Sequence, residues 1–134
     1  MRKAMMFGAM LLASGAPAMA QQTRPETPAM LFFDWGKPDI NGDAAIVLDQ
    51  IANAYRARAG GLIVSGHSDR SGGAAPNRQS SRKRALAARD YLVAHGVPAS
   101  AMTIEAFGEE RPLVATEDGV REPQNRRVEI RPAA

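Results

Sequence analysis

Residues 62–96, LIVSGHSDRSGGAAPNRQSSRKRALAARDYLVAHG, hold the pattern that decides the fold. The stretch opens with a short run rich in β-branched residues between two glycines, which is typical of a buried strand. A turn over residues 71–76 follows, and then a helix is expected from about residue 77 to 95, before Gly96 and Pro98. Its inner stripe, spaced at helical intervals, consists of Ser81, Ala85, Ala88 and Leu92.

The sequence on either side predicts one further helix and three further strands. Residues 29–33 form a short apolar run that indicates a strand, and residues 102–107 and 127–131 indicate two more. Asn41 or Asp43 is expected to cap a helix that ends at Gly60 and Gly61. Its apolar face consists of Val47, Leu48, Ile51, Ala52 and Tyr55. The predicted order is β-α-β-α-β-β.

The loop over residues 108–125, GEERPLVATEDGVREPQN, has no clear period and contains two prolines and two glycines. A loop of this length in a compact domain is usually functional or packs on itself.

The first twenty residues read as a signal peptide. Arg2 and Lys3 precede the apolar residues 4–13, and Ala18-Met19-Ala20 is a cleavage signal. The apolar run is shorter than the roughly 20 residues that a membrane span needs. Residues 21–28 are polar and contain proline, which suits a flexible tether. We therefore expect an exported domain over residues 29–134 without a transmembrane segment.

Composition narrows the class of protein. The 134 residues contain no cysteine, so neither a disulfide nor lipid attachment through a thiol is expected. The formal net charge of +3 falls to +1 when Arg2 and Lys3 leave with the signal peptide. This balance gives no reason to expect a nucleic acid partner, although basic residues cluster over residues 78–89 and 121–131.

The candidate catalytic patterns are weak. His67, Ser68 and Asp69 are the residue types of a hydrolase triad, but consecutive side chains point in different directions, and a triad needs residues that meet in space. The sequence has no cluster of three or four histidines, cysteines or carboxylates that would bind zinc. The glycines at 66, 72 and 73 do not form a phosphate-binding pattern. We expect neither an enzyme nor a cofactor nor a bound metal.

Asp69 and Arg84 are the candidate binding pair. They lie fifteen residues apart across the strand end, the turn and the start of the basic helix. Arg84 stands at the border of the inner stripe, so its guanidinium is expected to lean into a cleft that Asp69 faces. One fixed anion and one fixed cation would together grip a zwitterion. The alternative for Asp69 is an Asx-turn, and the two roles are compatible.

Several separated motifs resemble the OmpA-like peptidoglycan-binding domain over about residues 31–131. They are GHSDRSGG at 66–73, Asn77, Ser81, Arg84-Ala85, HGVP at 95–98, FGEERP at 107–112 and NRRVEI at 125–130. The resemblance implies an α/β (α+β) sandwich with two helices packed on one mixed four-stranded sheet. It also implies binding of peptidoglycan in the periplasm, at or near the outer membrane.

The resemblance assigns residues to the site. In the family, an aspartate and an arginine at the positions of Asp69 and Arg84 hold the diaminopimelate of the stem peptide. Asp34 is a secondary candidate, and Asn77 is expected to position the ligand. Ser68 stands where the family usually carries threonine, a change that keeps the hydroxyl group.

Two other functions stay open at this point. An envelope protein partner could be bound through the loop over residues 108–125. A wall-active hydrolase is the third possibility.

Overall fold

The computed structural model describes residues 27–133; the expected signal peptide (1–20) and most of the expected tether (21–28) lie outside the described residues. The helices and strands follow the predicted β-α-β-α-β-β order. They are β1 (Ala29–Phe32), α3 (Gly42–Ala57), β2 (Leu62–Gly66), α4 (Ala74–Ala94), β3 (Met102–Ala106) and β4 (Arg127–Pro132). Two short 3-10 turns, η2 (Ala99–Ala101) and η3 (Pro123–Asn125), precede β3 and β4.

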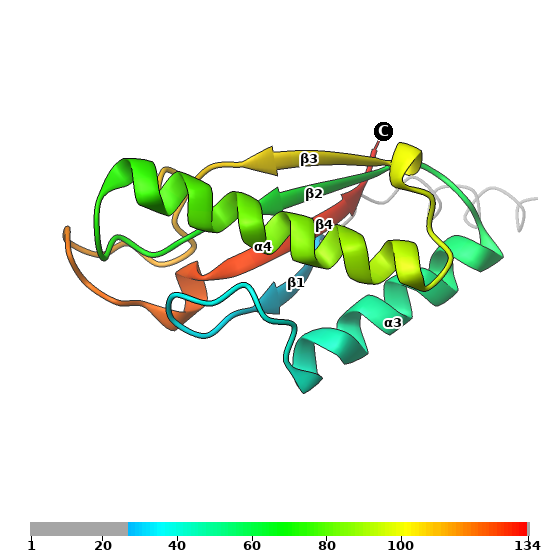
Figure 1. Cartoon of the computed structure of the whole chain (residues 1–134), viewed down its shortest axis with the longest axis horizontal. Helices are drawn as coiled ribbons and strands as arrows, with labels where there is room; N and C mark the ends of the chain where they lie inside the picture. Colours follow the sequence, from blue (N-terminus) through cyan, green and yellow to red (C-terminus); the bar gives the residue numbers. More distant parts are fainter. Residues whose placement is uncertain (1–26, 134) are drawn as a thin grey trace, which may run out of the picture.

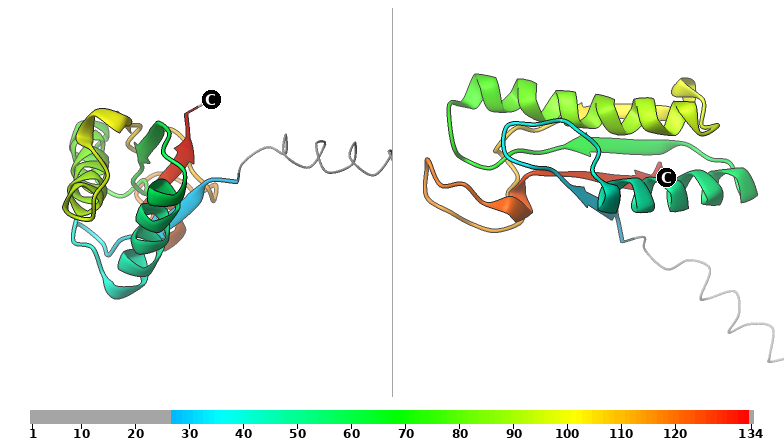
Figure 2. Two further views of the ribbon diagram at one scale, coloured as in Figure 1. Left: turned by 90° about the vertical axis from the view of Figure 1, so that its right-hand side faces the viewer. Right: turned by 60° about the horizontal axis from the view of Figure 1, so that its bottom comes forward.

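The four strands form one mixed sheet in the order β1-β4-β2-β3. Strand β2 pairs with β3 in parallel and with β4 antiparallel, and β1 pairs with β4 antiparallel. Both helices lie on the same face of the sheet, as Figures 1 and 2 show. The expected sandwich of two helices on a mixed four-stranded sheet is therefore confirmed.

The two faces of the sheet differ in chemistry. The face under the helices carries apolar side chains that pack with both helices, namely Leu31, Val64, Val128 and Ile130 from the strands, Ala44, Leu48 and Ala52 from α3, and Ala85, Ala88 and Leu92 from α4. On the other face, the Ser65 hydroxyl donates to Glu105 at 3.0 Å, and Arg127 pairs with Glu129 at 2.7 Å. Among residues 27–133, no helix combines the length and apolar character that a membrane crossing needs.

The first residues of the two helices can be compared with those expected from the sequence. Asn41 caps α3, because its side-chain oxygen accepts a hydrogen bond from the Ala44 backbone N–H at 2.8 Å. Helix α4 begins at Ala74, three residues earlier than expected. Pro76 therefore lies in the first turn, where a missing backbone N–H costs no helical hydrogen bond.

Helix α4 lies in close contact with β2 at what we call the seam, formed by Gly66, Ser81 and Ala85. A Cβ atom at Gly66 would lie only 1.9 Å from the backbone oxygen of Ser81. The Ser81 hydroxyl also accepts a hydrogen bond from the backbone N–H of Gly108 at 2.9 Å. The seam therefore fixes α4 against both β2 and the start of the long loop.

The loop over residues 108–125 packs on itself. The side-chain oxygen of Asn125 accepts from the backbone N–H groups of Leu113 and Val114, both at 2.8 Å. Its amide nitrogen donates to the backbone oxygen of Val114 at 2.8 Å. Asn125 is fully buried, so this one side chain organises much of the loop.

The pairing of strand β1 shows at which end of the sheet the chain enters the domain. Ala29 pairs with Ile130, and Phe32 pairs with Arg127 at the other end of the strand. The backbone N–H of Phe33 continues this pairing to the oxygen of Arg126. The chain therefore enters at one end of the sheet and runs toward the other, where β2 ends at Gly66.

Candidate functional site

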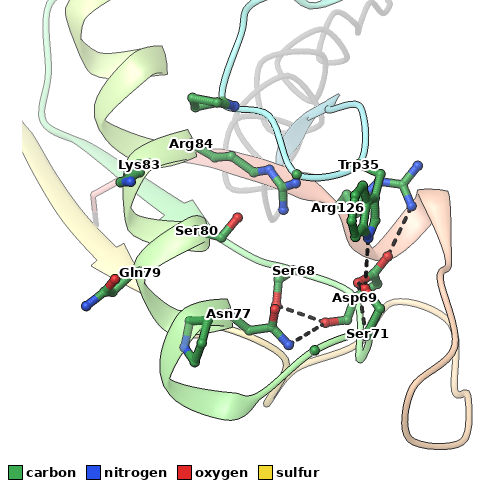
Figure 3. A pocket seen from close by; sticks show the side chains of 14 residues that line it. Trp35, Ser68, Asp69, Ser71, Asn77, Gln79, Ser80, Lys83, Arg84 and Arg126 are labelled. Atoms are coloured by element: carbon green, nitrogen blue, oxygen red, sulfur yellow. Dashed lines mark hydrogen bonds and ion pairs between the residues drawn. The ribbon is translucent and has the colours of Figure 1, made fainter.

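A cavity of about 470 Å³ lies beyond the end of β2 at which Gly66 stands. Its walls come from three places: the segment after β1, the turn between β2 and α4, and the first half of α4, with Arg126 closing one side (Figure 3). The volume lies within the roughly 300–1,000 Å³ of small-ligand pockets. The charged residues that line it are Asp69, Lys83, Arg84 and Arg126.

Asp69 lies in this cavity with its carboxylate already engaged. It is 3% exposed. Its Oδ1 accepts from the Ser71 hydroxyl at 2.6 Å and from the Ser71 backbone N–H at 3.1 Å, the geometry of the expected Asx-turn. Its Oδ2 accepts from the Glu122 backbone N–H and from Arg126 Nη1, each at 3.1 Å. These four donors fill the accepting capacity of the carboxylate.

The protonation state of Asp69 follows from these contacts. Burial raises the pKa of the carboxyl, but the hydrogen bonds from Ser71, Arg126 and Glu122 outweigh burial and hold the pKa below its usual value. The group is therefore an anion at neutral pH.

Arg84 crosses the cavity from α4, as Figure 3 shows. Its Nε donates to the backbone oxygen of Lys37, Nη1 to that of His67 and Nη2 to that of Asp34, each at 3.2 Å. As expected, its guanidinium leans into the cavity that Asp69 also lines, and at 2% exposed the residue is more deeply buried than a position at the border of the stripe suggests. The guanidinium reaches inward because three backbone carbonyls offer it partners there.

Arg84 keeps its charge in this position. Burial and the neighbouring Arg126 lower its pKa to about 10, and Asp69 opposes that shift. Three of its five N–H groups donate to carbonyls, which leaves two without a partner among residues 27–133.

Ser68 and Asn77 also line the cavity, and both hold the turn that carries Asp69. The Ser68 hydroxyl donates to the backbone oxygen of Asp69 at 3.0 Å. The Asn77 amide donates to the same oxygen at 3.2 Å and to Glu109 at 2.8 Å. Asp34 differs, because its side chain is exposed and does not line the cavity. Only its backbone oxygen reaches the site, through Arg84.

Two residues of the site were missed in the sequence. Arg126 lies 57 residues after Asp69, pairs with its carboxylate, and donates through Nε to the backbone oxygen of Phe33 at 3.0 Å. Trp35 lines the cavity and donates through Nε1 to the Ser71 hydroxyl at 3.0 Å. The NRRVEI motif was the available signal for Arg126. The neighbouring Arg127 belongs instead to the far face of the sheet, where it pairs with Glu129.

The three consecutive residues His67, Ser68 and Asp69 do not form a proton relay. The His67 ring is buried and stacks on Phe107 with the ring centroids 5.5 Å apart. Neither of its nitrogens has a hydrogen-bond partner within residues 27–133. Burial and the nearby Arg127 lower its pKa to about 4, so the ring is neutral at pH 7. The part of the chain that the structure describes also holds no cluster of three or more possible metal ligands.

The cavity is therefore a cationic recess with one internal anion. Three basic side chains line it, and the single lining carboxylate is already paired with Arg126. Such a recess favours a ligand that carries a carboxylate, and Asp69 adds a place for a cationic group if Arg126 yields its contact.

The OmpA family matches residues 32–126. An outer membrane protein of Gluconacetobacter diazotrophicus is 37% identical over 114 residues, and the match covers 78% of this chain and 30% of that protein. A peptidoglycan-associated lipoprotein of Mesorhizobium japonicum is 34% identical over 118 residues, covering 86% of this chain and 69% of that protein. The chain thus spans less than a third of the first relative and about two thirds of the second.

A solved structure has the same fold. The crystal structure of the peptidoglycan-associated lipoprotein from Burkholderia pseudomallei superimposes with a TM-score of 0.71 at 25% identity. The superposition covers 76% of this chain and 87% of that one. The likeness therefore extends over nearly the whole described domain.

Proposed function

The chain belongs to the OmpA family, and on that premise we propose that it is a non-catalytic module that binds peptidoglycan and tethers the cell wall within the envelope. The observation that carries the proposal is the convergence of Asp69, Arg84 and Arg126 on one cavity. Relatives named peptidoglycan-associated lipoprotein support the choice of ligand.

The proposed ligand group is the free amino-acid head of diaminopimelate, which carries an ammonium and a carboxylate on one carbon. The ligand carboxylate would accept from N–H groups of Arg84 and Arg126 that make no contact within residues 27–133. The ammonium would take the place of Arg126 on Oδ2 of Asp69, because that carboxylate has no free accepting site. Binding is then an exchange of partners, so we expect a modest affinity for a single stem peptide.

A modest affinity for one stem peptide is sufficient when the ligand is a polymer that repeats the peptide. The wall presents many copies of the stem peptide, and rebinding raises retention above what one site supplies. The role of the module would be to stay near the wall rather than to hold one peptide for long.

The first test is cosedimentation with purified sacculi. Asp69→Asn and Arg84→Lys should each lower retention about tenfold or more, because each removes part of one charge-assisted contact. Arg89→Lys is the matched control, since Arg89 lies on the same helix and does not line the cavity. Retention of both cavity variants at the wild-type level would rule out the proposed site.

A second test separates the zwitterion from simple charge. Free diaminopimelate should displace the protein from sacculi, whereas pimelate, which lacks both amines, and cadaverine, which lacks both carboxylates, should not. Equal displacement by either control compound would contradict the pairing of one anion with one cation in the site.

We also propose that residues 1–20 direct export and are removed, which places the domain in the periplasm, at or near the outer membrane. The support is the leader pattern that ends at Ala20 and the outer-membrane name of one relative. Mass spectrometry of the protein from a periplasmic fraction should give a chain that begins at Gln21; an intact leader would contradict this.

A further inference from the structure

Trp35 is held on two sides at the mouth of the cavity. Its Nε1 donates to the Ser71 hydroxyl at 3.0 Å, and that hydroxyl donates to Asp69 Oδ1 at 2.6 Å. The guanidinium carbon of Arg121 lies 3.6 Å from the centroid of the indole ring. Two independent contacts, one at the edge and one on a face, thus fix the orientation of the ring.

Trp35 nevertheless keeps a large exposed area. It is 49% exposed although it lines the cavity. Arg121 covers one face of the ring, so the other face is the one on which a ligand ring can stack. In Figure 3 the indole stands beside Arg126 and Asp69, on the side of the cavity opposite α4. A rigid apolar surface next to a charged recess is organised for a ligand that has an apolar face and a charged end.

A ligand that uses both places has to span the distance between Asp69 and the indole. Two hydrogen bonds, through the Ser71 hydroxyl, join the indole nitrogen to the carboxylate. In peptidoglycan the stem peptide hangs from a sugar of the glycan strand, and diaminopimelate is its third residue. The connection from the free head group to the sugar consists of the diaminopimelate side chain and two further residues, which is longer than the roughly 7 Å that two extended residues alone cover. The stem peptide can therefore fold back and bring the sugar to Trp35 while the head group lies at Asp69.

We infer that Trp35 forms a second subsite, which binds a sugar ring of the glycan strand on its open face. The inference rests on the proposed binding of peptidoglycan and extends it from the peptide to the glycan. A pyranose ring presents C–H groups on its faces and hydroxyl groups at its rim. Such a ring covers the indole while its hydroxyl groups stay in water, which suits a half-exposed tryptophan.

The experiment compares two purified ligands by titration calorimetry or NMR. One is the stem tripeptide that ends in diaminopimelate, and the other is the same tripeptide attached to its disaccharide. The wild-type protein should bind the second about three- to tenfold more tightly, the scale of one good stacking contact. Trp35→Ala should bring the ratio of the two affinities close to one.

Two further variants distinguish stacking on the aromatic ring from the loss of the indole N–H and from general effects of removing an exposed aromatic side chain. Trp35→Phe keeps an aromatic face and loses the N–H, so the ratio should stay above about half of its wild-type value if stacking produces it. Phe32→Ala is the matched control, because Phe32 is 41% exposed and does not line the cavity. Thermal unfolding of each variant checks that the domain is intact.

The outcomes are distinct. Equal wild-type affinity for both ligands overturns the sugar subsite and leaves the proposed function in place. A Trp35→Ala variant that weakens both ligands by the same factor, or a Trp35→Phe variant that loses the ratio completely, also overturns the subsite. Failure of the wild-type protein to bind either ligand overturns the proposed function and the subsite with it.

Discussion

The seam and the cavity beside it consist of neighbouring residues, but close backbone packing stabilises the seam, whereas hydrogen bonds and charges stabilise the cavity. At the seam, Gly66 lies against the backbone of Ser81 so closely that no side-chain atom fits between them. In the cavity, polar and charged groups line an open space, and Arg84 keeps two N–H groups without partners among the described residues. The seam thus fixes where α4 lies, and the cavity depends on that position for the placing of its charges.

We expect the largest loss of stability from a substitution that disrupts the seam. Gly66→Ala places a Cβ atom against the Ser81 backbone, so α4 must move away from β2. We expect a loss of more than about 3 kcal/mol in the free energy of unfolding, measured by urea denaturation, because the added atom meets backbone that cannot give way. Gly42→Ala is the control, because nothing lies within 4 Å of the added atom. A Gly66→Ala protein as stable as the control variant would show that the close approach is not required.

Next in size is the removal of the buried cation. Arg84→Met leaves the backbone oxygens of Asp34, Lys37 and His67 without their donor. We expect the free energy of unfolding to fall by about 3 kcal/mol, because buried acceptors lose charge-assisted hydrogen bonds. Arg89→Met should cost far less, because Arg89 is half-buried and its guanidinium donates to the neighbouring exposed Asp90. If the two substitutions cost the same, Arg84 would be a binding residue without a structural role.

His67 lies between Gly66 of the seam and Asp69, and the burial of its neutral imidazole is expected to make the stability of the domain depend on pH. Its pKa is lowered from an unperturbed value near 6.5 to about 4, so the unfolded chain takes up the proton first as pH falls. The stabilisation is present above about pH 6.5 and is lost progressively toward pH 4. We expect a loss of roughly 2 to 3 kcal/mol between pH 7 and pH 4.5.

Denaturation of the His67→Phe variant across the same pH range isolates the imidazole. This variant should show a smaller loss between pH 7 and pH 4.5, because the side chain at position 67 no longer titrates in that window. A pH dependence identical to that of the wild-type protein would assign the loss to other groups.

The smallest change concerns an exposed ion pair that joins α4 to the long loop. Arg78 and Glu110 form this pair with side chains that are 57% and 56% exposed. Glu110→Gln should change the free energy of unfolding by less than about 0.5 kcal/mol, because water already screens the charges. A larger loss in urea denaturation would mean that the loop contributes more to the fold than its exposure suggests.

The sequence predicted the elements well because their patterns are local. The stripe of Ser81, Ala85, Ala88 and Leu92 is fully buried, as helical spacing indicated. The strands differ from the expected ranges by one residue at most. Asp69 and Arg84 do line the same cavity, since a strand that leads directly into a helix keeps their separation short.

The rest depends on residues that are distant in the chain. The pairing of Asp69 with Arg126 joins positions on different strand ends, and no local period encodes it. Arg84 is buried because its guanidinium donates to backbone carbonyls of the segment after β1. That segment lies beside α4 only once the sheet has folded. The same segment carries Trp35 into the site and leaves the Asp34 carboxylate outside.

The course of β1 has a mechanical consequence. The strand begins at the end of the sheet away from the cavity, so whatever precedes residue 27 is attached opposite the proposed ligand. If the proposed ligand is held at Asp69, tension between it and that attachment acts along β1. The hydrogen bonds to β4 are then loaded together in shear, whereas a strand peeled from its edge breaks them one by one. The short ladder from Ala29 to Phe32 would thus set the force that the module transmits.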